Sequence, residues 1–188
     1  MTRIIAGAAG SLTLRVPRSG TRPTSDRVRE AIFSSLEARD LLDGAAVLDL
    51  FAGTGALGLE AASRGAAEVT LVDGAAAAVA VCRQNAHAVT GRLGDAASIA
   101  VVGQPAAAYL RTTTRMFDLV FIDPPYEGTA AELDAVLAAL AAHLTPDALV
   151  VVERAKRSPE PGWPSSLERV ARRAYGETIV WEARPASP

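Results

Sequence analysis

Residues 47–58 read Val47-Leu48-Asp49-Leu50-Phe51-Ala52-Gly53-Thr54-Gly55-Ala56-Leu57-Gly58. The first five residues form an apolar run of strand length, the glycines mark a tight turn, and a helical pattern begins after them. The glycines match the spacing G-x-G-x-x-G, and Asp73 follows Gly53 at the end of the next apolar run. This combination is typical of a strand, turn and helix that hold a nucleotide at the carboxyl edge of a parallel sheet.

Strand-like and helical segments alternate on the carboxyl side of this stretch. We expect strands over 47–51, 68–72, 98–102, 118–122 and 148–153, helices over 56–64, 75–88, 104–111 and 130–142, and two further strands within 167–181. Apolar strands that alternate with helices predict an α/β fold: a Rossmann-like, mostly parallel seven-stranded sheet with helices on both faces.

The first 39 residues have a different pattern. Apolar Ile4-Ile5, two glycines and the alternating residues 12–16 predict a short β-hairpin, and residues 24–38 predict a helix capped by Thr24 or Ser25. We therefore expect an N-terminal hairpin and helix extension over 1–39 and a nucleotide-binding domain over 40–188.

Composition limits the possible classes of protein. No apolar run reaches membrane-spanning length, and the N-terminus is too short and too punctuated for a signal peptide. One cysteine, Cys82, excludes an internal disulfide, and two histidines leave little material for a zinc site. These features predict a cytoplasmic protein without a metal or a membrane partner, with Cys82 as a small buried residue.

Charge is distributed unevenly along the chain. Residues 1–39 carry seven arginines and three acids, a balance of +4, whereas residues 40–150 carry five arginines and thirteen acids, a balance of −8. A basic section on an acidic body suggests a polyanionic partner. The plain alternative is a solvated helix face with Arg–Glu pairs.

The glycine turn is compatible with two cofactors, NAD and S-adenosylmethionine. Asp73 fits the ribose hydroxyls of either one. A dinucleotide pyrophosphate is an anion, which Asp49 at the end of the first strand would repel. S-adenosylmethionine carries an ammonium and a sulfonium, which an acidic turn favours. The alternative for Asp49 is a side chain that faces away and caps a turn.

A second motif, Asp123-Pro124-Pro125-Tyr126, follows the expected strand 118–122. Two prolines stiffen the loop and leave carbonyl acceptors free. A carboxylate, carbonyls and an aromatic ring suit a planar amino group, which can donate to the oxygens and stack on the ring. The motif therefore predicts an amine-binding site, although a loop that only packs has the same composition.

Together these residues resemble the RsmD family of bacterial 16S rRNA guanine-N2 methyltransferases. The resemblance covers nearly the whole chain, including Arg3-Ile4-Ile5-Ala6-Gly7, the glycine turn, Asp123-Pro124-Pro125-Tyr126 and Tyr175-Gly176. Its most specific part is Arg22-Pro23-Thr24-Ser25-Asp26-Arg27-Val28-Arg29-Glu30-Ala31-Ile32-Phe33.

The resemblance implies a class I methyltransferase with S-adenosylmethionine as methyl donor and a guanine of 16S rRNA, in an assembled or assembling 30S subunit, as acceptor. It implies a monomeric enzyme. The expected cofactor-binding residues are Asp49, Phe51, Ala52, Gly53, Thr54, Gly55, Asp73 and Gln104. Gln104 stands where the family usually places an acid near the adenine amine.

The same resemblance and the charge pattern assign roles to further residues. Asp123 and the Pro124 carbonyl would accept the amine hydrogens, Pro125 would stiffen the loop, and Tyr126 would stack on the base. The expected rRNA contacts are Arg15, Arg18, Arg22, Thr24, Arg27 and Arg29.

Other functions remain compatible with the same motifs. The site chemistry would also serve a DNA adenine-N6 or a protein glutamine-N5 methyltransferase, although the chain has no room for a separate DNA-recognition domain. A ribosome-assembly factor without turnover and an NAD-dependent dehydrogenase are the alternatives outside this class.

Overall fold

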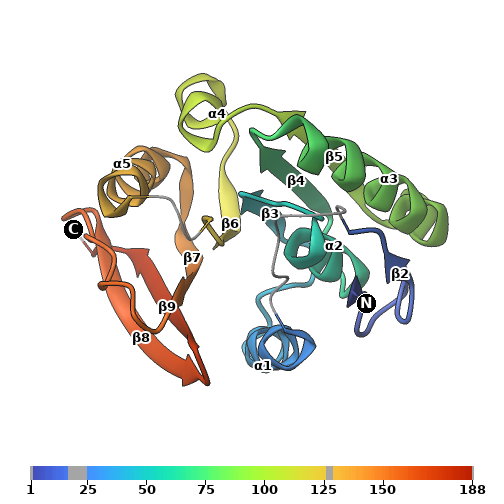
Figure 1. Ribbon diagram of the computed structural model, residues 1–188, viewed down its shortest axis with the longest axis horizontal. Helices are drawn as coiled ribbons and strands as arrows, with labels where there is room; N and C mark the ends of the chain where they lie inside the picture. The colour runs from blue at the N-terminus through green and yellow to red at the C-terminus, as the bar shows by residue number, and fades with distance from the viewer. Residues whose placement is uncertain (1, 17–24, 126–128, 188) are drawn as a thin grey trace.

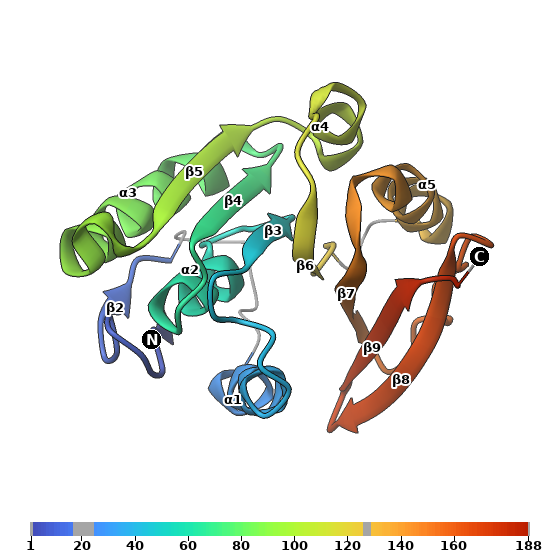
Figure 2. The same cartoon turned by 180° about the vertical axis from the view of Figure 1, so that it is seen from behind.

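The computed structural model describes residues 2–16, 25–125 and 129–187 of the chain. Its centre is a seven-stranded sheet in the order β5-β4-β3-β6-β7-β9-β8 (Figures 1 and 2). The strands are β3 (Ala46–Leu50), β4 (Glu68–Asp73), β5 (Ser98–Gly103), β6 (Phe117–Ile122), β7 (Leu144–Ala155), β8 (Leu167–Tyr175) and β9 (Thr178–Pro185). Strands β3 to β7 are parallel, and β9 pairs antiparallel with both β7 and β8. The predicted fold class is confirmed.

Helices cover both faces of the sheet. One face packs against α1 (Asp26–Glu37), α2 (Ala56–Ser63) and α3 (Ala76–Leu93), and the other packs against α4 (Ala106–Thr112) and α5 (Ala130–Leu140). Single 3₁₀ turns follow α3 at Gly94–Ala96 and α5 at Ala141–His143. Alternation along β3 shows why two cores form, because Val47 points into the first core and Leu48 into the second.

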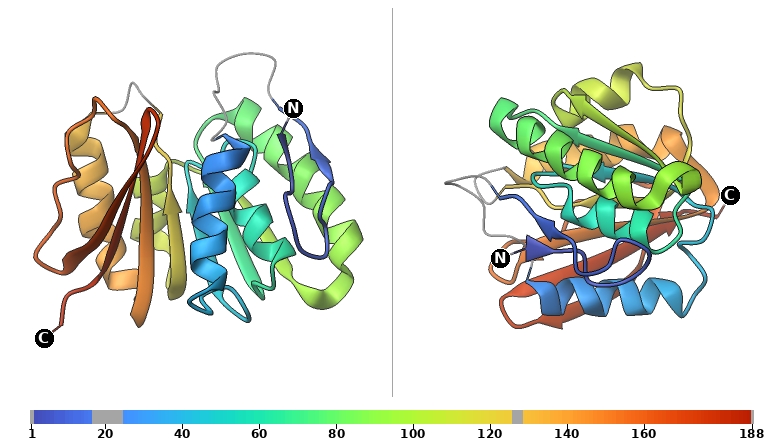
Figure 3. Two further views of the ribbon diagram at one scale, coloured as in Figure 1. Left: turned by 90° about the horizontal axis from the view of Figure 1, so that it is seen from below. Right: turned by 90° about the vertical axis from the view of Figure 1, so that its right-hand side faces the viewer.

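The N-terminal hairpin consists of β1 (Thr2–Arg3) and β2 (Thr13–Leu14). It lies beside α2 on the same face of the sheet as α1 (Figure 3). The buried Glu60 carboxylate of α2 accepts the backbone N–H groups of Ile5 at 2.7 Å and Ala6 at 3.0 Å. Ile4 and Phe33 belong to the first core, so residues 1–39 and 40–188 share a hydrophobic core. The division that we propose at residue 39 therefore separates two functional roles and not two cores.

Most expected elements lie within two residues of the observed ones, and three differ more. Strand β9 ends at Pro185, four residues past the expected limit at 181. Helix α3 continues to Leu93, five residues past the expected end. Strand β7 begins at Leu144 rather than at residue 148, because Leu144 pairs with Phe117 before a register shift. Thr145, Pro146 and Asp147 interrupt the apolar pattern, so the sequence did not predict this first part of the strand.

Candidate active site

The glycine turn after β3 has a tightly constrained backbone. Phe51, Gly53 and Gly55 all have positive φ, at 61°, 56° and 80°. For Phe51 this conformation is strained, and such strain is often found at ligand-binding turns. A Cβ on Gly55 would lie 3.1 Å from the Cys82 Sγ, so this position needs glycine for its φ and for space. Burial raises the pKa of the Cys82 thiol to about 12, so Cys82 is the small buried residue that was expected.

Asp73 at the end of β4 fixes the shape of this turn. Its Oδ2 accepts the Gly53 N–H at 2.9 Å, and its Oδ1 accepts the Ala75 N–H at 2.8 Å. The carboxylate is only partly buried. Asp73 therefore joins two neighbouring strand ends and still presents an acceptor at the carboxyl edge of the sheet.

Asp49 lies beneath the turn. Its side chain is almost fully buried, and its Oδ2 accepts the Gly58 N–H in the first turn of α2 at 2.9 Å. The pKa of Asp49 is raised to about 7, mainly by burial and in smaller part by nearby Asp123 and Asp73, while the Gly58 hydrogen bond acts in the opposite direction. Asp49 therefore caps the start of α2, which is the capping role that the alternative predicted. It also belongs to a group of three carboxylates with Asp73 and Asp123.

Asp123 and Pro124 follow the last residue of β6 and are half-buried, whereas Pro125 is exposed. Strand β6 is the neighbour of β3, so the Asp123-Pro124-Pro125 stretch and the glycine turn lie at adjacent strand ends. Tyr126, the predicted base-stacking residue, lies outside the described residues.

The remaining predicted cofactor residues lie around the same edge. Ala52 and Thr54 are buried within the turn, and Gln104 is exposed directly after β5, beside β4. The Thr54 carbonyl accepts a hydrogen bond from the Asn85 Nδ2 at 2.8 Å. Asn85 of α3 also exchanges two hydrogen bonds with the Arg15 backbone, at 2.8 and 3.0 Å, so it links the hairpin to the turn. Nothing in the sequence singles out Asn85.

The residues predicted to contact rRNA differ in exposure, and some of them lie outside the described residues. Arg15 and Arg27 are exposed, and Arg18, Arg22 and Thr24 lie outside the described residues. The assignment of Arg29 is wrong for this structure, because its side chain has no exposed surface. One Arg29 Nη donates to the Arg3 carbonyl at 2.7 Å and to the Asp26 carboxylate at 2.8 Å, so Arg29 joins α1 to the hairpin.

Two basic residues that the sequence did not single out lie at the carboxyl edge. Lys156 and Arg157 directly follow β7 and are exposed. The Lys156 N–H donates to the Glu177 carbonyl in the β8–β9 turn at 2.8 Å. These residues place positive charge beyond the end of β7, the strand that neighbours β6.

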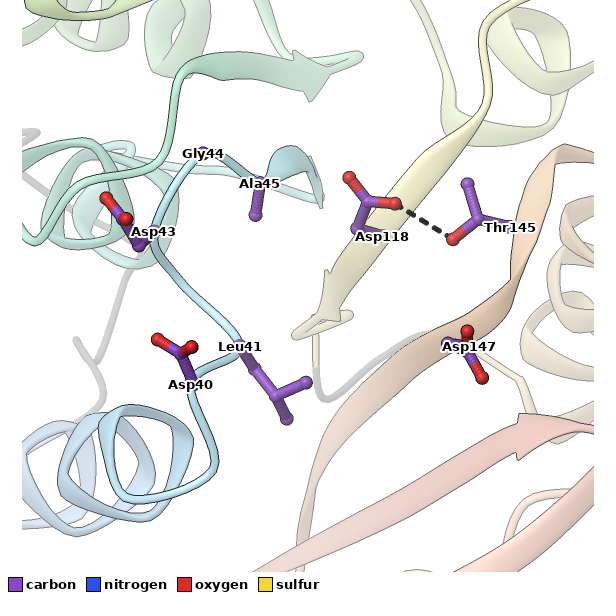
Figure 4. Close-up of a pocket in the computed structure, with 8 residues that line it drawn as sticks. All are labelled: Asp40, Leu41, Asp43, Gly44, Ala45, Asp118, Thr145 and Asp147. Carbon is purple, nitrogen blue, oxygen red and sulfur yellow. Dashed lines mark hydrogen bonds between the residues drawn. The ribbon is translucent and has the colours of Figure 1, made fainter.

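A pocket of about 220 Å³ lies at the opposite edge of the sheet (Figure 4). It is formed where β3, β6 and β7 begin, and its lining residues are Asp40, Leu41, Asp43, Gly44, Ala45, Asp118, Thr145 and Asp147. Asp118 is used structurally, because it accepts the Ala46 N–H and the Thr145 hydroxyl, both at 2.9 Å. Four carboxylates and no cation line a site that would repel RNA, so this pocket is separate from the candidate active site.

The described residues offer neither a metal-binding cluster nor a membrane-spanning helix. They contain no group of three or more His, Cys, Asp or Glu side chains that could hold a metal ion. Within the same residues, no helix combines the length and the apolar character needed to cross a membrane.

Comparison with known proteins gives consistent matches over almost the whole chain. The family model described as Conserved hypothetical protein 95 matches residues 2–184. The chain is 38% identical to Ribosomal RNA small subunit methyltransferase D of Escherichia coli K12 over 90% of its own length and 84% of that protein. It is 35% identical to the Haemophilus influenzae protein of the same name, over 84% and 80% of the two chains.

A solved structure agrees with these matches. A hypothetical protein of Thermus thermophilus superimposes with a TM-score of 0.81 at 31% identity, over 97% of this chain and 98% of that one. The turn, the carboxylates and the Asp123-Pro124 loop thus occur on a chain that belongs to the Conserved hypothetical protein 95 family, the RsmD family of class I methyltransferases.

Proposed function

We propose that this chain transfers a methyl group from S-adenosylmethionine to the exocyclic N2 amine of a guanine in 16S rRNA. The observation that carries the proposal is the group of three carboxylates at the carboxyl ends of β3, β4 and β6. Asp123 and Asp73 both raise the pKa of buried Asp49, so their charges interact across the gap between the strand ends.

These carboxylates fit a cationic ligand and oppose an anionic one. A positive charge between them would relieve their mutual repulsion, whereas a pyrophosphate would increase it. This favours S-adenosylmethionine over NAD for the G-x-G-x-x-G turn. Asp49 and the turn residues 51–55 would hold the methionine end, Asp73 the ribose and Gln104 the adenine.

When bound, S-adenosylmethionine supplies an activated methyl group. The chain's own residues act on the acceptor. Asp123 and the Pro124 carbonyl would accept the two hydrogens of the amine, which orients the nitrogen lone pair. As positive charge develops on that nitrogen, the Asp123 carboxylate stabilises it. Tyr126 would stack on the base.

Exposed cations around this edge support an RNA substrate. Arg15, Arg27, Lys156 and Arg157 could contact phosphates on either side of the Asp123 loop. The names of the relatives from Escherichia coli and Haemophilus influenzae point to small-subunit ribosomal RNA. We therefore propose a monomeric cytoplasmic enzyme that acts on an assembled or assembling 30S subunit.

Methyl transfer to two substrates tests this proposal. Unmodified 30S subunits and naked 16S rRNA would be incubated with the protein and labelled S-adenosylmethionine, and the modified base would be mapped. We expect label on the N2 amine of one guanine, with the 30S subunit as the better substrate. Label on adenine, or no label on either substrate, would refute the proposed activity.

A further inference from the structure

The strand register places a fourth acidic residue at the level of Asp123. Ile122 of β6 pairs with Val152 of β7, and Leu50 of β3 pairs with both Ile122 and Val72 of β4. The residues that follow these in their strands are Asp123, Glu153, Phe51 and Asp73. Asp73, Asp123 and Glu153 therefore lie in one row across the carboxyl edge.

The Glu153 side chain projects from the face of the sheet that α1 and α2 cover. Val151, two residues earlier, belongs to the first core, and Glu153 pairs across the strands with Val180 of the same core. The same alternation along β6 puts Leu119 and Phe121 into the first core, and continued past the strand end at Ile122 it directs Asp123 to the same face. Asp123 and Glu153 thus leave adjacent parallel strands, about 4.8 Å apart, in the same direction.

Glu153 is 8% exposed, and each of the two carboxylates has an interaction partner in the structure. A buried carboxylate is costly to retain unless it makes strong polar contacts. Glu182, the next buried acid on this face, binds Arg39, two residues after the end of α1, at 2.9 and 3.1 Å, and Arg173 of β8 at 2.5 Å. Glu182 therefore joins elements together, whereas Glu153 lies beside the proposed amine site.

Guanine presents two kinds of donor that fit this pair. Its N2 amine and its N1–H are attached to the same ring carbon, so a base whose amine reaches Asp123 turns its N1–H towards a neighbouring group. Adenine and 2-aminopurine have an unprotonated N1, which accepts hydrogen bonds. A carboxylate facing N1 attracts guanine and repels both other bases.

We propose that Glu153 determines the specificity for guanine by accepting the N1–H hydrogen bond while Asp123 binds the N2 amine. This inference rests on the proposed guanine methylation and adds a residue that chooses the base. A site built to bond one hydrogen rejects an analogue that lacks it, because the carboxylate is then left against an acceptor.

The test compares guanine with 2-aminopurine, which keeps the amine and lacks N1–H. Reconstituted 30S subunits would carry either base at the mapped position, and kcat/KM would be measured for the wild type and Glu153→Gln. We expect the wild type to prefer guanine by more than about 100-fold. In Glu153→Gln the preference should fall by at least about tenfold, because the amide can donate to the 2-aminopurine N1.

Two further variants separate specificity from folding. Glu153→Asp keeps the charge and should keep the wild-type preference at a lower rate. Glu182→Gln weakens the contacts to Arg39 and Arg173 and should lower the melting temperature without changing the preference. The different intrinsic reactivities of the two amines enter every preference equally, so they cancel when the preferences of two variants are compared.

The outcomes distinguish the two proposals. If the wild type fails to methylate guanine-containing subunits, the proposed function fails and this inference fails with it. If the wild type methylates them and folded Glu153→Gln keeps the wild-type preference, only the role of Glu153 is overturned. Should Glu153→Gln not fold, the wild type decides the question, because a wild type that methylates guanine and 2-aminopurine with equal kcat/KM would overturn the role of Glu153.

Discussion

Asp49 is the residue whose charge depends most on what the site binds. Burial raises its pKa to about 7 in the ligand-free protein, so its protonation changes around neutral pH. A cationic ligand favours the carboxylate, so binding lowers the pKa and releases a proton. Affinity for S-adenosylmethionine should therefore rise with pH until Asp49 is ionised in the free protein, and then level off.

Calorimetric titration between pH 6 and pH 8 measures this effect. With a free pKa near 7 and a much lower bound pKa, the dissociation constant should be about tenfold smaller at pH 8 than at pH 6. Asp49→Asn can still accept the Gly58 N–H but does not titrate. It should bind more weakly and with no such pH dependence; an equal pH dependence in the variant would assign the proton to another group.

Asp123 is the second residue for which we predict a specific effect of substitution. Asp123→Ala removes the proposed acceptor for the amine and leaves the glycine turn, Asp73 and the Gly58 contact of Asp49 in place. We expect kcat for 30S methylation to fall by at least about 100-fold, with S-adenosylmethionine binding retained. A thermal-shift titration and a single-turnover assay measure the two quantities separately, and unchanged turnover would remove Asp123 from the mechanism.

Among the elements, the contact between the hairpin and α2 depends on close backbone approach. Gly7 has a φ of 79°, and a Cβ there would lie 1.9 Å from the Ser63 carbonyl oxygen, which accepts the Ala8 N–H. Gly7→Ala must therefore push the hairpin away from α2. We expect a loss of more than about 2 kcal/mol in the free energy of unfolding.

Hydrogen exchange locates the effect of Gly7→Ala. The amides of Ile5, Ala6, Ala8 and Ala9, which donate to Glu60 and Ser63, should exchange faster than in the wild type. The matched control is Gly91→Ala in α3, where no atom lies within 4 Å of the added Cβ. The control should stabilise the protein by about 0.5–1 kcal/mol. Similar losses in both variants would show that the hairpin contact has no special role.

The central elements were predictable because their signals are local. Alternating apolar residues and glycine turns fix where β3 and α2 begin and end within a few positions. Strand β7 was placed too late because Thr145, Pro146 and Asp147 interrupt the apolar pattern, whereas the strand already begins where Leu144 pairs with Phe117 of β6. Helix α3 runs on beyond its expected end because Val89 and Leu93 reach the core.

The site was only partly predictable, for a reason of distance along the chain. Asp73 and Asp123 each end a strand next to a recognisable turn, so sequence alone could point to them. Glu60 and Asn85 bind partners that are far away in the sequence, and the position of Glu153 depends on strand register. Neither property produces a recognisable sequence motif. The role of Arg29 was predicted wrongly because the sequence does not show that the hairpin contacts the face of α1 on which Arg29 lies.

At the scale of the whole molecule, the two edges of the sheet differ in charge. The amino edge carries the pocket of Asp40, Asp43, Asp118 and Asp147. The carboxyl edge carries exposed cations around the acidic site, because Arg27 lies in the first turn of α1 and Lys156 and Arg157 follow the end of β7. RNA should therefore approach the carboxyl edge, with its phosphates on the cations and one base at Asp123.

The salt dependence of RNA binding tests this orientation. Each phosphate contact adds about 0.7–0.9 to the slope of log K against log salt concentration. Arg27→Gln with Arg157→Gln should therefore reduce the slope for 16S rRNA by about 1.5. The control, Arg92→Gln with Arg111→Gln, removes the same charge from the last turns of α3 and α4, at the amino edge. It should leave the slope unchanged, whereas equal reductions in the two double variants would mean that net charge, and not a defined RNA-binding edge, controls affinity.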